Sequence, residues 1–454
     1  MVCSLSGNAQ QSPWERSCPK AALQVDFNLM RRAVEQSHPA LDLHHSRHLL
    51  EQQFDSLSAL IHEAPISEAY SLFAEAVDHV EDGHTNLLLG EKETGYILDQ
   101  EAFFPFTLKL IDGKAYVNHN FSEHDFLERG SELLSVNGTS INEIISQLEH
   151  FVTCDGRSRL AKLETLEGQF WWYYGLRFGY RRTFHIEFIE PQGGKVKALV
   201  ASAVNYSDRF DMLSEVYGFE WEPSSDFYFS IDGDLAVITV NSFAGVSPWV
   251  YERFLNNCFR QINVQGINHL VLDIRKNGGG REGFDNVLLS HFNHTLEQKY
   301  DRIVAKTMSY SEYGQLERPK YSQFKDWMYR VFEFKPTEEG WTRKYDRFER
   351  KLKPSKYTFD GDVYVLISGQ VFSAGSDFAA MAKEYIPNCL LIGSETLGGN
   401  QGNASGYYYR VVLPNTGFVL EVPRVLFELN INNPNKHGGV EPDIHVVTSI
   451  EDFL

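Results

Sequence analysis

The sequence predicts an α/β protein with three regions: an N-terminal helical region at residues 1–93, a β-rich domain at residues 94–206 and an α/β core at residues 207–454. Apolar residues recur every three or four positions before residue 90 and alternate in strand-like segments in the middle region. Buried-type strands alternate with helical segments in the last half of the chain. This strand–helix order predicts a core built on a parallel sheet.

The N-terminal region has helical patterning. We expect a first helix over residues 26–37, with Asp26 as a capping-type residue, ending before His38 and Pro39. A second helix is expected to begin at Ser67, a good N-cap residue. Its apolar residues follow at helical spacing: Tyr70, Phe73, Val77 and Val80. We expect this helix to end at Gly83, which can take a left-handed conformation.

The middle region is rich in strands. Residues 106–110 alternate between apolar and polar, and Asp112-Gly113 directly after them predicts a tight turn. Residues 130–139 form a second expected strand, which ends in an Asn137-Gly138 turn. A helix is expected to follow at about residues 141–150.

The last region alternates strands and helices. Its expected strands and helices are, in chain order, 235–240 (strand), 248–262 (helix), 269–274 (strand), a helical pattern through 288, 363–367 (strand), 376–385 (helix) and 389–392 (strand). Residues from about 300 to 357 interrupt this order, and we interpret them as an insertion in the core.

Composition excludes several classes of function. The chain is 43% hydrophobic and 23% charged, which is ordinary for a globular protein. Its net charge of -19 repels phosphate backbones, so we expect no nucleic-acid partner. No apolar run approaches the roughly 20 residues that span a bilayer, and no signal peptide is visible. The five cysteines are too widely spaced for a zinc pattern, and we expect no metal and no cofactor.

A serine lies between a buried strand and a helix in residues 367–380. The strand ends at Ile367, Gly369 lies in a short turn, and Ser373 comes just before the expected helix. A serine here presents its hydroxyl at the carboxyl end of a strand, where α/β sheets place their sites. The helix N-terminus beside it favours a developing oxyanion. The alternative is that Ser373 or Ser376 serves only as a helix N-cap.

A second strand ends in three consecutive glycines, Gly278, Gly279 and Gly280. Glycines allow close backbone approach and can direct N–H groups at an anion, so this segment could form half of an oxyanion hole. It matches neither the P-loop nor the dinucleotide-binding pattern. A tight turn between strand and helix, without a site, is the alternative.

His84 follows a helix and a glycine. A neutral imidazole can accept the proton of a serine hydroxyl, which makes His84 a candidate general base. A structural histidine that is hydrogen-bonded near a helix end is the alternative.

Together and in this order, these segments resemble the C-terminal processing (tail-specific) peptidases and the related core of tricorn-type proteases. Asp273–Gly280 is similar to the family's glycine-rich strand end, and Ser373–Asp377 is similar to its nucleophile motif. Asp82-Gly83-His84-Thr85 matches the element after the N-terminal helices, and residues 130–141 resemble a PDZ-type segment. Gly439–Ile444 matches the closing motif. The resemblance implies a crotonase/ClpP-like α/β protease core with a PDZ-like middle domain.

The same resemblance implies a serine-type endopeptidase that acts on peptides or unfolded protein tails. Ser373 would attack the carbonyl, and the N–H groups of Gly279 and Ala374 would hold the oxyanion. Gly278 and Gly280 would contact the substrate. The family also implies a periplasmic, cell-envelope or secreted location. The oligomeric state stays open.

One departure from the family concerns the general base. The best-known members carry a lysine base in a Thr-Phe-Gly-Lys-Gly segment, whereas the matching residues 393–403 contain no lysine. We therefore expect His84 to be the base, as in histidine-using tricorn-like members. Those members place a serine before the histidine, where this chain has Gly83, so the group behind His84 stays open. Glu395 is either that supporting carboxylate or a turn-capping residue. Lys436 either enters the site or is exposed.

Two other functions fit the sequence. The missing lysine and Gly83 favour a peptide-binding protein that has lost catalysis. The family's distant likeness to retinoid-carrier modules implies the other alternative, a carrier whose aromatic run at residues 170–174 holds an apolar small molecule. From the residues alone, the run either lines a peptide groove or packs in the core. The insertion is either a surface loop or a flap whose positive charge attracts a peptide carboxylate. Its basic residues include Arg318, Lys320, Lys325, Arg343, Lys344, Arg347, Arg350 and Lys351.

Overall fold

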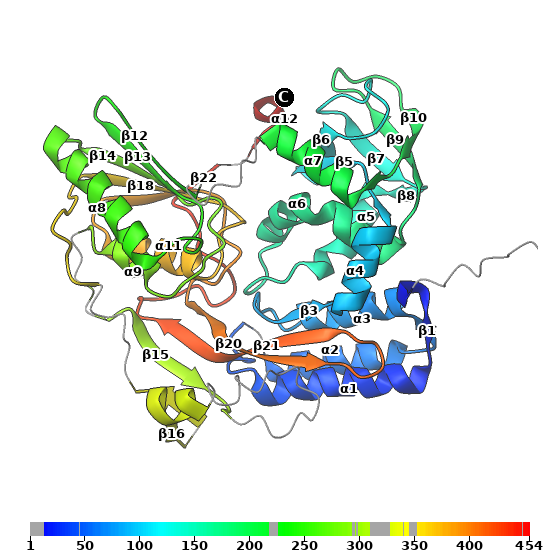
Figure 1. Cartoon of the computed structure of the whole chain (residues 1–454), viewed down its shortest axis with the longest axis horizontal. Helices are drawn as coiled ribbons and strands as arrows, with labels where there is room; N and C mark the ends of the chain where they lie inside the picture. Colours follow the sequence, from blue (N-terminus) through cyan, green and yellow to red (C-terminus); the bar gives the residue numbers. More distant parts are fainter. Residues whose placement is uncertain are drawn as a thin grey trace, which may run out of the picture.

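The structure is a computed structural model of the 454-residue chain. It describes residues 13–44, 46–217, 226–292, 296, 298–308, 327–338, 340–344, 352–446 and 448–454. Figure 1 shows the α/β core on the left, the N-terminal helices and the middle domain on the right, and a long hairpin, β20 and β21, that runs from the left side to the N-terminal helices.

The core is built on a six-stranded mixed sheet. Its strands are, in spatial order, β12 (Phe227–Asp232), β13 (Leu235–Val240), β14 (His269–Asp273), β18 (Asp362–Ile367), β19 (Cys389–Gly393) and β22 (Ile444–His445). Only the β12–β13 pair is antiparallel among these strands, and the pairs from β13 to β22 are parallel. The predicted parallel arrangement is therefore confirmed.

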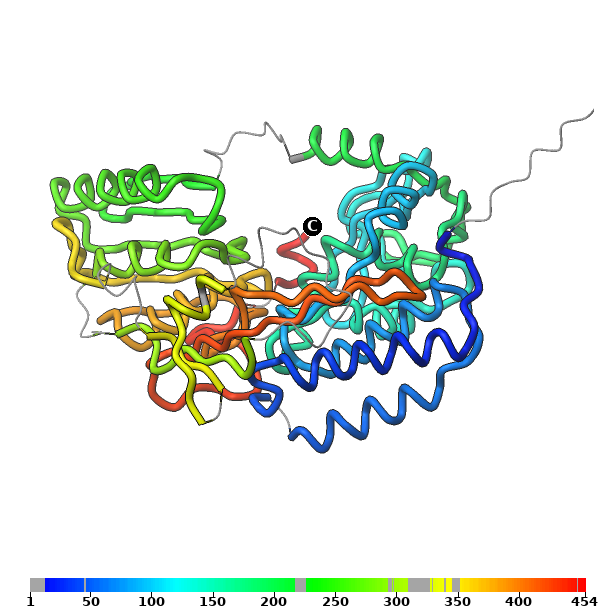
Figure 2. The backbone as a smooth tube through the Cα atoms, turned by 60° about the horizontal axis from the view of Figure 1, so that its bottom comes forward, coloured from blue at the N-terminus to red at the C-terminus, as the bar shows by residue number. Residues whose placement is uncertain are grey.

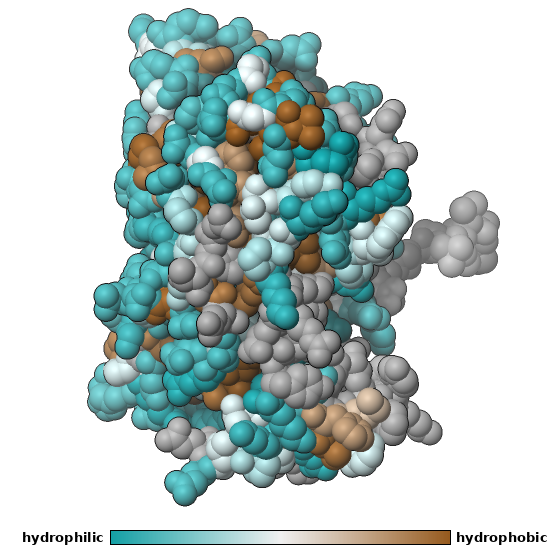
Figure 3. Space-filling view, turned by 90° about the vertical axis from the view of Figure 1, so that its left-hand side faces the viewer, coloured by the Kyte–Doolittle hydropathy of each residue, from teal (hydrophilic) through white to brown (hydrophobic). Residues whose placement is uncertain are grey.

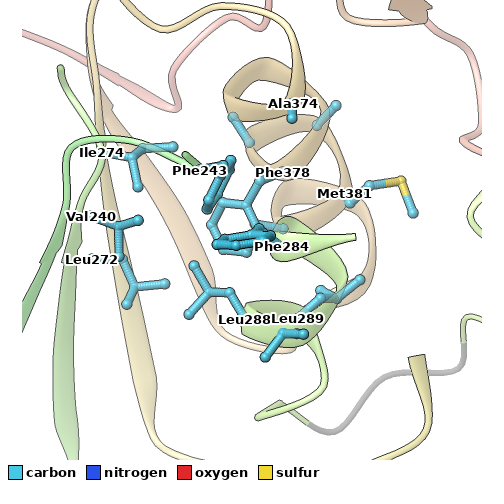
Figure 4. Packing of buried hydrophobic residues seen from close by; sticks show 14 of the residues in the cluster. Val240, Phe243, Leu272, Ile274, Phe284, Leu288, Leu289, Ala374, Phe378 and Met381 are labelled. Atoms are coloured by element: carbon cyan, nitrogen blue, oxygen red, sulfur yellow. The ribbon is translucent and has the colours of Figure 1, made fainter. Parts of the chain in front are cut away.

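Helices pack against this sheet and bury its apolar residues. They are α8 (Pro248–Gln265), α9 (Phe284–Leu289) and α11 (Ala374–Tyr385). Figure 4 shows Phe243, Phe284 and Phe378 meeting between these helices and the strands, and all three are buried. The outer face of this part of the molecule is mostly hydrophilic (Figure 3), although Trp249 on α8 is 65% exposed.

The middle domain contains an antiparallel sheet and two helices. The strands are β5 (Phe106–Ile111), β6 (Lys114–Asn120), β7 (Glu132–Val136), β8 (Thr139–Ser140), β9 (Thr183–Ile189) and β10 (Lys197–Ser202), and the helices are α5 (Ile141–Leu148) and α6 (Arg159–Phe178). The predicted turns are confirmed, because Asp112-Gly113 and Asn137-Gly138 all have positive φ. The aromatic run lies on α6, where Phe170 and Tyr174 are buried in the core of this domain. Its likeness to a PDZ domain stays a prediction.

The N-terminal helices differ from the predicted ones at their ends. They are α1 (Lys20–Ser37), α2 (Arg47–Leu60) and α3 (Ile66–Asp78). Asp26 is no cap: it lies inside α1, is buried, and accepts hydrogen bonds from the backbone and side chains of Asn415 and Thr416. Ser67 lies inside α3, which begins one residue after Pro65. The left-handed residue after α3 is Glu81, with φ 56°, and not Gly83.

A long hairpin connects the two sides of the molecule. It consists of β20 (Gly402–Val412) and β21 (Val419–Leu429), which form a sheet with β15 (Tyr300–Ala305), β17 (Gly340–Arg343), β16 (Phe334–Thr337) and β3 (Asn86–Leu88). Figures 1 and 2 both show the hairpin running alongside α1. Val411 and Leu420, near its tip, pack with the N-terminal helices, whereas Val425 and Phe427 pack in the core of the parallel sheet.

The predicted boundary between residues 93 and 94 lies inside helix α4 (Glu91–Gln100). The predicted boundary at residue 206 coincides with the start of α7 (Tyr206–Tyr217). The remaining short elements are η1 (Pro13–Glu15), β1 (Ser17–Cys18), β2 (Ala64–Pro65), β4 (Ala102–Phe103), η2 (Glu149–Phe151), β11 (Val204–Asn205), η4 (Tyr329–Glu333) and α12 (Ile450–Phe453). Among the described helices, none is long and apolar enough to cross a membrane.

Candidate active site

Ser373 lies at the point where the chain passes from β18 to helix α11. Its backbone has φ 53° and ψ −126°, a conformation that residues with a side chain rarely adopt and that costs on the order of 1–3 kcal/mol. Its side chain forms no capping hydrogen bond with the helix. The structure therefore gives no support to the alternative that Ser373 is only an N-cap. Such strained strand-to-helix turns present nucleophilic serines in other hydrolase folds.

The glycine segment lies directly against Ser373. β14 and β18 are parallel neighbours, so the segments after them leave the sheet at the same edge. Gly279 has φ 93°, and a Cβ atom there would lie 2.8 Å from the Ser373 Cβ. Only a glycine fits this position without moving the serine.

The N–H group of Gly279 is already engaged. It donates to Asn277 Oδ1 over 2.9 Å, and Asn277 Nδ2 donates to the carbonyl of Val240 over 3.0 Å. Asn277 is completely buried, so this arrangement is fixed by the core. In this structure Gly279 does not offer its N–H to an oxyanion, contrary to the prediction. Its role is to allow close approach.

Gly280 is the better-placed donor. Phe243 forms a parallel bridge around it, because the Phe243 N–H donates to the Gly279 carbonyl and the Arg281 N–H donates to the Phe243 carbonyl. Gly280 lies between the Gly279 carbonyl and the Arg281 N–H, which both face Phe243, so its own N–H points to the opposite side of the strand. Ala374 is the first residue of α11, where backbone N–H groups have no partner within the helix.

Gly280, Ser373 and Ala374 line one cavity of about 360 Å³. The other lining residues are aromatic or charged: Glu282, Lys299, Tyr300, Asp377, Asn403, Ser405, Gly406, Tyr407, Tyr408 and Phe427. Gly278 is exposed and is not part of this lining. The cavity thus joins the serine, two backbone N–H groups and an aromatic wall.

His84 lies beside the serine segment. Strand β3, which follows it, pairs with the first residues of β21 and so fixes its position against the hairpin. Its ring stacks on Phe372, the residue before Ser373, with 4.3 Å between the ring centroids. His84 is 7% exposed, and its Nδ1 atom is buried without a hydrogen-bond partner among the described residues. The structure thus places His84 against Phe372, the neighbour of Ser373 in the chain, and no hydrogen bond between His84 and Ser373 is found among the described residues.

Two buried carboxylates lie next to His84. One side-chain ligand atom from each of Asp82, His84 and Asp155 lies within 4.8 Å of the others. Asp155 accepts hydrogen bonds of 2.8 Å from the N–H groups of Gly83 and Gly399, one on each oxygen. Sequence reasoning missed Asp155, because nothing in its local pattern distinguishes it from a loop residue.

The two carboxylates have opposite pKa shifts. Burial opposes ionisation of Asp82, but His38, whose Nε2 lies 3.1 Å away, and His84 outweigh it and lower the pKa of Asp82. Burial and the Asp82 charge raise the pKa of Asp155. The pair therefore favours one negative charge, carried by Asp82.

These three side chains are also of the kinds that bind transition metals. However, both oxygens of Asp155 accept N–H donors, and Asp82 Oδ2 accepts the hydroxyl of Thr85. Because these donors already occupy the carboxylates, the group fits a carboxylate–imidazole arrangement better than a cation cage.

A buried lysine, which sequence reasoning also missed, lines the same cavity as Ser373. Lys299 Nζ is ion-paired with Asp285, lies 2.9 Å from Asp377 Oδ2 and donates to the Tyr300 hydroxyl over 2.8 Å. Burial lowers the pKa of Lys299, but the two carboxylates outweigh it and raise that pKa well above 10.5. A general base must be neutral, so Lys299 is not suited to that role. Of these buried residues, only Asp377, in the first turn of α11, belongs to a motif that the sequence indicated, Ser373–Asp377.

Glu395 and Lys436 are engaged elsewhere. Glu395 Oε1 accepts the N–H of Gly439 over 2.7 Å, which ties it to the closing motif, and no contact with His84 is found among the described residues. The carbonyl of Lys436 accepts a hydrogen bond from His44 Nδ1 over 2.7 Å. The structure does not bring Glu395 to the general base.

The basic insertion is described only in part. Arg343 is buried and pairs with Glu282, at the cavity, over 2.8 Å, and Lys344 donates to the carbonyl of Val331. Neither is a free surface cation. The other basic residues named for the insertion, Arg318, Lys320, Lys325, Arg347, Arg350 and Lys351, lie outside the described residues.

A comparison with protein families gives a match for this chain. Residues 234–446 match the model of Peptidase family S41. The α/β core therefore belongs to this family. Its members are serine-type peptidases, and the resemblance to C-terminal processing peptidases is thereby confirmed. A comparison with curated protein sequences gives no match.

The fold of this S41 family member is similar to that of mature CPAF. The two share 14% sequence identity over 96% of this chain and 94% of CPAF, with a TM-score of 0.61. Mature CPAF complexed with lactacystin gives 15% identity, 96% and 95% coverage and a TM-score of 0.61. The photosystem II D1 C-terminal processing protease matches with 13% identity, 93% coverage of both chains and a TM-score of 0.41. At these identities the likeness concerns the fold alone.

Proposed function

We propose that the protein is a serine endopeptidase that cleaves peptides or unfolded protein tails, with Ser373 as nucleophile and His84 as general base. Membership of peptidase family S41 supports the reaction class. The observation that carries the assignment is the strained backbone of Ser373 at the start of α11, with its side chain free of the helix.

In the proposed reaction, Ser373 Oγ bonds to the substrate carbonyl carbon while its proton passes to His84. The carbonyl oxygen becomes an oxyanion that the N–H groups of Gly280 and Ala374 stabilise. His84 then gives the proton to the leaving amine, and water hydrolyses the acyl-enzyme by the reverse sequence. Loss of one oxyanion donor costs about 3 kcal/mol in such reactions.

A serine-directed fluorophosphonate probe tests the nucleophile. We expect the probe to label the native protein and not Ser373→Ala. Ser376→Ala is the matched control: this serine lies three residues further along the same chain segment, is buried, and donates to the Val371 carbonyl over 3.1 Å. Labelling of Ser376→Ala should therefore persist. Equal labelling of Ser373→Ala and native protein would refute the assignment.

Cleavage of an unfolded protein, followed by mass spectrometry, tests the reaction class. Product from the native protein and none from Ser373→Ala supports the proposal. Affinity for peptides without any product would instead favour the non-catalytic peptide-binding alternative. Lactacystin, which is bound in one structure of CPAF, offers a second probe to compete with the fluorophosphonate.

A further inference from the structure

We propose that the buried carboxylates Asp82 and Asp155 are positioning residues for His84, with Asp82 supplying the negative charge that stabilises its imidazolium and Asp155 fixing the loop that carries the base and the loop at residues 397–399. This inference rests on the proposed function. It fills the place behind the general base that Glu395 does not occupy in this structure.

Asp155 connects the segment of the base with the loop at residues 397–399. Its carboxylate accepts the N–H of Gly83, next to His84, and the N–H of Gly399. Its own N–H donates to the Leu397 carbonyl over 3.1 Å. One buried side chain therefore joins two loops that are far apart in the sequence.

Both of these loops lie in close contact with the nucleophile turn. A Cβ atom on Gly398 would lie 2.9 Å from the Ser373 backbone nitrogen. A Cβ atom on Gly83 would lie 2.5 Å from the Phe372 ring, on which His84 stacks. Displacing the Asp155 carboxylate would therefore alter the relative position of His84 and Ser373 from both sides.

His84 offers a donor that matches this carboxylate pair. Its Nδ1 atom is buried and has no hydrogen-bond partner among the described residues, and one nitrogen of its ring lies within 4.8 Å of an oxygen of each carboxylate. A hydrogen bond from Nδ1–H to Asp82 would fix the tautomer that leaves Nε2 free to accept the serine proton. Such bonds commonly tighten when substrate binds.

The groups known to face His84 are two aromatic rings and the two carboxylates. Phe372 and Tyr408 are the aromatic neighbours, and burial and nearby Asp82 raise the pKa of Tyr408, so its hydroxyl is neutral. Asp82 and Asp155 are the charged neighbours, with His38 beside Asp82 and His44 acting on Asp155. The low pKa of Asp82 makes it the anion of the pair. A fixed anion near a buried imidazole favours the protonated form that arises during the reaction.

Kinetics of the Asp82→Asn and Asp155→Asn variants test this inference. For Asp82→Asn we expect kcat to fall by about 10³- to 10⁴-fold with a smaller change in KM, as when the carboxylate behind a catalytic histidine is lost. Loss of the anion should weaken the stabilisation of the imidazolium that forms in the reaction, so the loss should fall on kcat. Asp82→Glu should recover part of kcat. Asp155→Asn should lower kcat as well, because its single amide oxygen cannot accept both N–H groups as the carboxylate does.

Asp26→Asn is the matched control. Asp26 is a fully buried carboxylate that accepts hydrogen bonds from Asn415 and Thr416, far along the hairpin from Ser373. Its loss should lower the melting temperature and leave kcat unchanged. A wild-type kcat in both Asp82→Asn and Asp155→Asn would overturn the inference. The same holds if Glu395→Gln alone reproduces the expected loss.

Histidine NMR separates failure of this inference from failure of the proposed function. With ¹⁵N-labelled histidine, and the His84 signals assigned from a His84→Gln spectrum, the tautomer with the proton on Nδ1 should be more populated in the native protein than in Asp82→Asn. This measurement does not require activity. A native protein that no probe labels would refute the proposed function, whereas equal tautomer populations in the native protein and Asp82→Asn, in an active enzyme, would refute only the role of Asp82.

Discussion

Replacement of Lys299 distinguishes a structural ion pair from a catalytic lysine. Lys299 lines the cavity of Ser373, as a lysine base would, but its ammonium group is held by Asp285 and Asp377. Lys299→Met keeps the length of the side chain and removes its charge. We expect this variant to lose stability and, once folded, to keep reacting with the fluorophosphonate probe.

The size of the loss follows from burial. The side chains of Lys299, Asp285 and Asp377 are only 2–3% exposed, so Lys299→Met leaves two unpaired carboxylates in the interior. Removing one partner of a buried ion pair costs about 3–5 kcal/mol. For a chain of this size, with an unfolding entropy of about 2.1 cal/mol/K per residue, we expect the melting temperature to fall by about 3–5 °C.

The pH dependence of this loss gives a second measure. Burial raises the pKa of Asp377 even with Lys299 present, and loss of the cation raises it further. Protonation relieves the unpaired charge, so the difference in melting temperature from native protein should shrink as the pH falls. The triple variant Asp285→Asn, Lys299→Met, Asp377→Asn should recover much of the stability, because it removes all three charges together.

The assay combines thermal unfolding with the rate of probe labelling, measured well below the melting temperature of the variant. If the Lys299→Met variant melts like the native protein but is no longer labelled by the probe, the structural role of Lys299 is refuted. That result would make Lys299 the general base and His84 a neighbour of the site.

Two further predictions concern the supports of the site. Asn277→Ala removes the acceptor of the Gly279 N–H and the donor to the Val240 carbonyl. Each buried group left without a partner costs about 1–3 kcal/mol. We therefore expect a lower melting temperature and slower labelling by the probe. Asp78 links helix α3 to His150 and Lys162: burial opposes its ionisation, but these partners lower its pKa, while the hydrogen bond to Asp78 raises the pKa of His150. The contribution of Asp78 to the free energy of unfolding is therefore present above its unfolded pKa of about 3.9 and is lost as the pH falls through its folded pKa. The contribution of His150 is complete below its unfolded pKa of about 6.5 and is lost as the pH rises through its folded pKa. Urea unfolding across this pH range should show that the free energy of unfolding depends less on pH in Asp78→Asn than in the native protein. The same pH dependence in both proteins would contradict the role given to the Asp78 ion pairs.

Local patterns predicted the strands of the core and the turns well. The strands of the parallel sheet and the Asp112-Gly113 and Asn137-Gly138 turns follow from apolar runs and residue preferences that act over a few positions. Helix starts were predicted less well. Asp26 and Ser67 are good N-cap residues, but Asp26 is instead used by a distant turn of the hairpin.

The groups that surround the predicted nucleophile could not be predicted from local patterns. Asp155 meets Gly83 and Gly399 only after three distant segments come together, and Lys299 meets Asp377 across an interior that no local rule describes. The choice between Gly279 and Gly280 depends on which N–H the side chain of Asn277 engages. Each of these depends on tertiary contacts, for which the residue type alone gives no direction.

The path of the β20–β21 hairpin has a consequence for synthesis of the chain. His84 is made early, but the strand that holds it, β3, pairs with β21, which ends at Leu429. Because the hairpin also joins the two hydrophobic cores, neither the docking of His84 nor the assembly of the cavity can precede the synthesis of β21. A ribosome-bound chain that ends before the hairpin therefore carries both proposed catalytic residues without the strand that holds His84 in place, so we expect the nascent chain to be inert until β21 has been made.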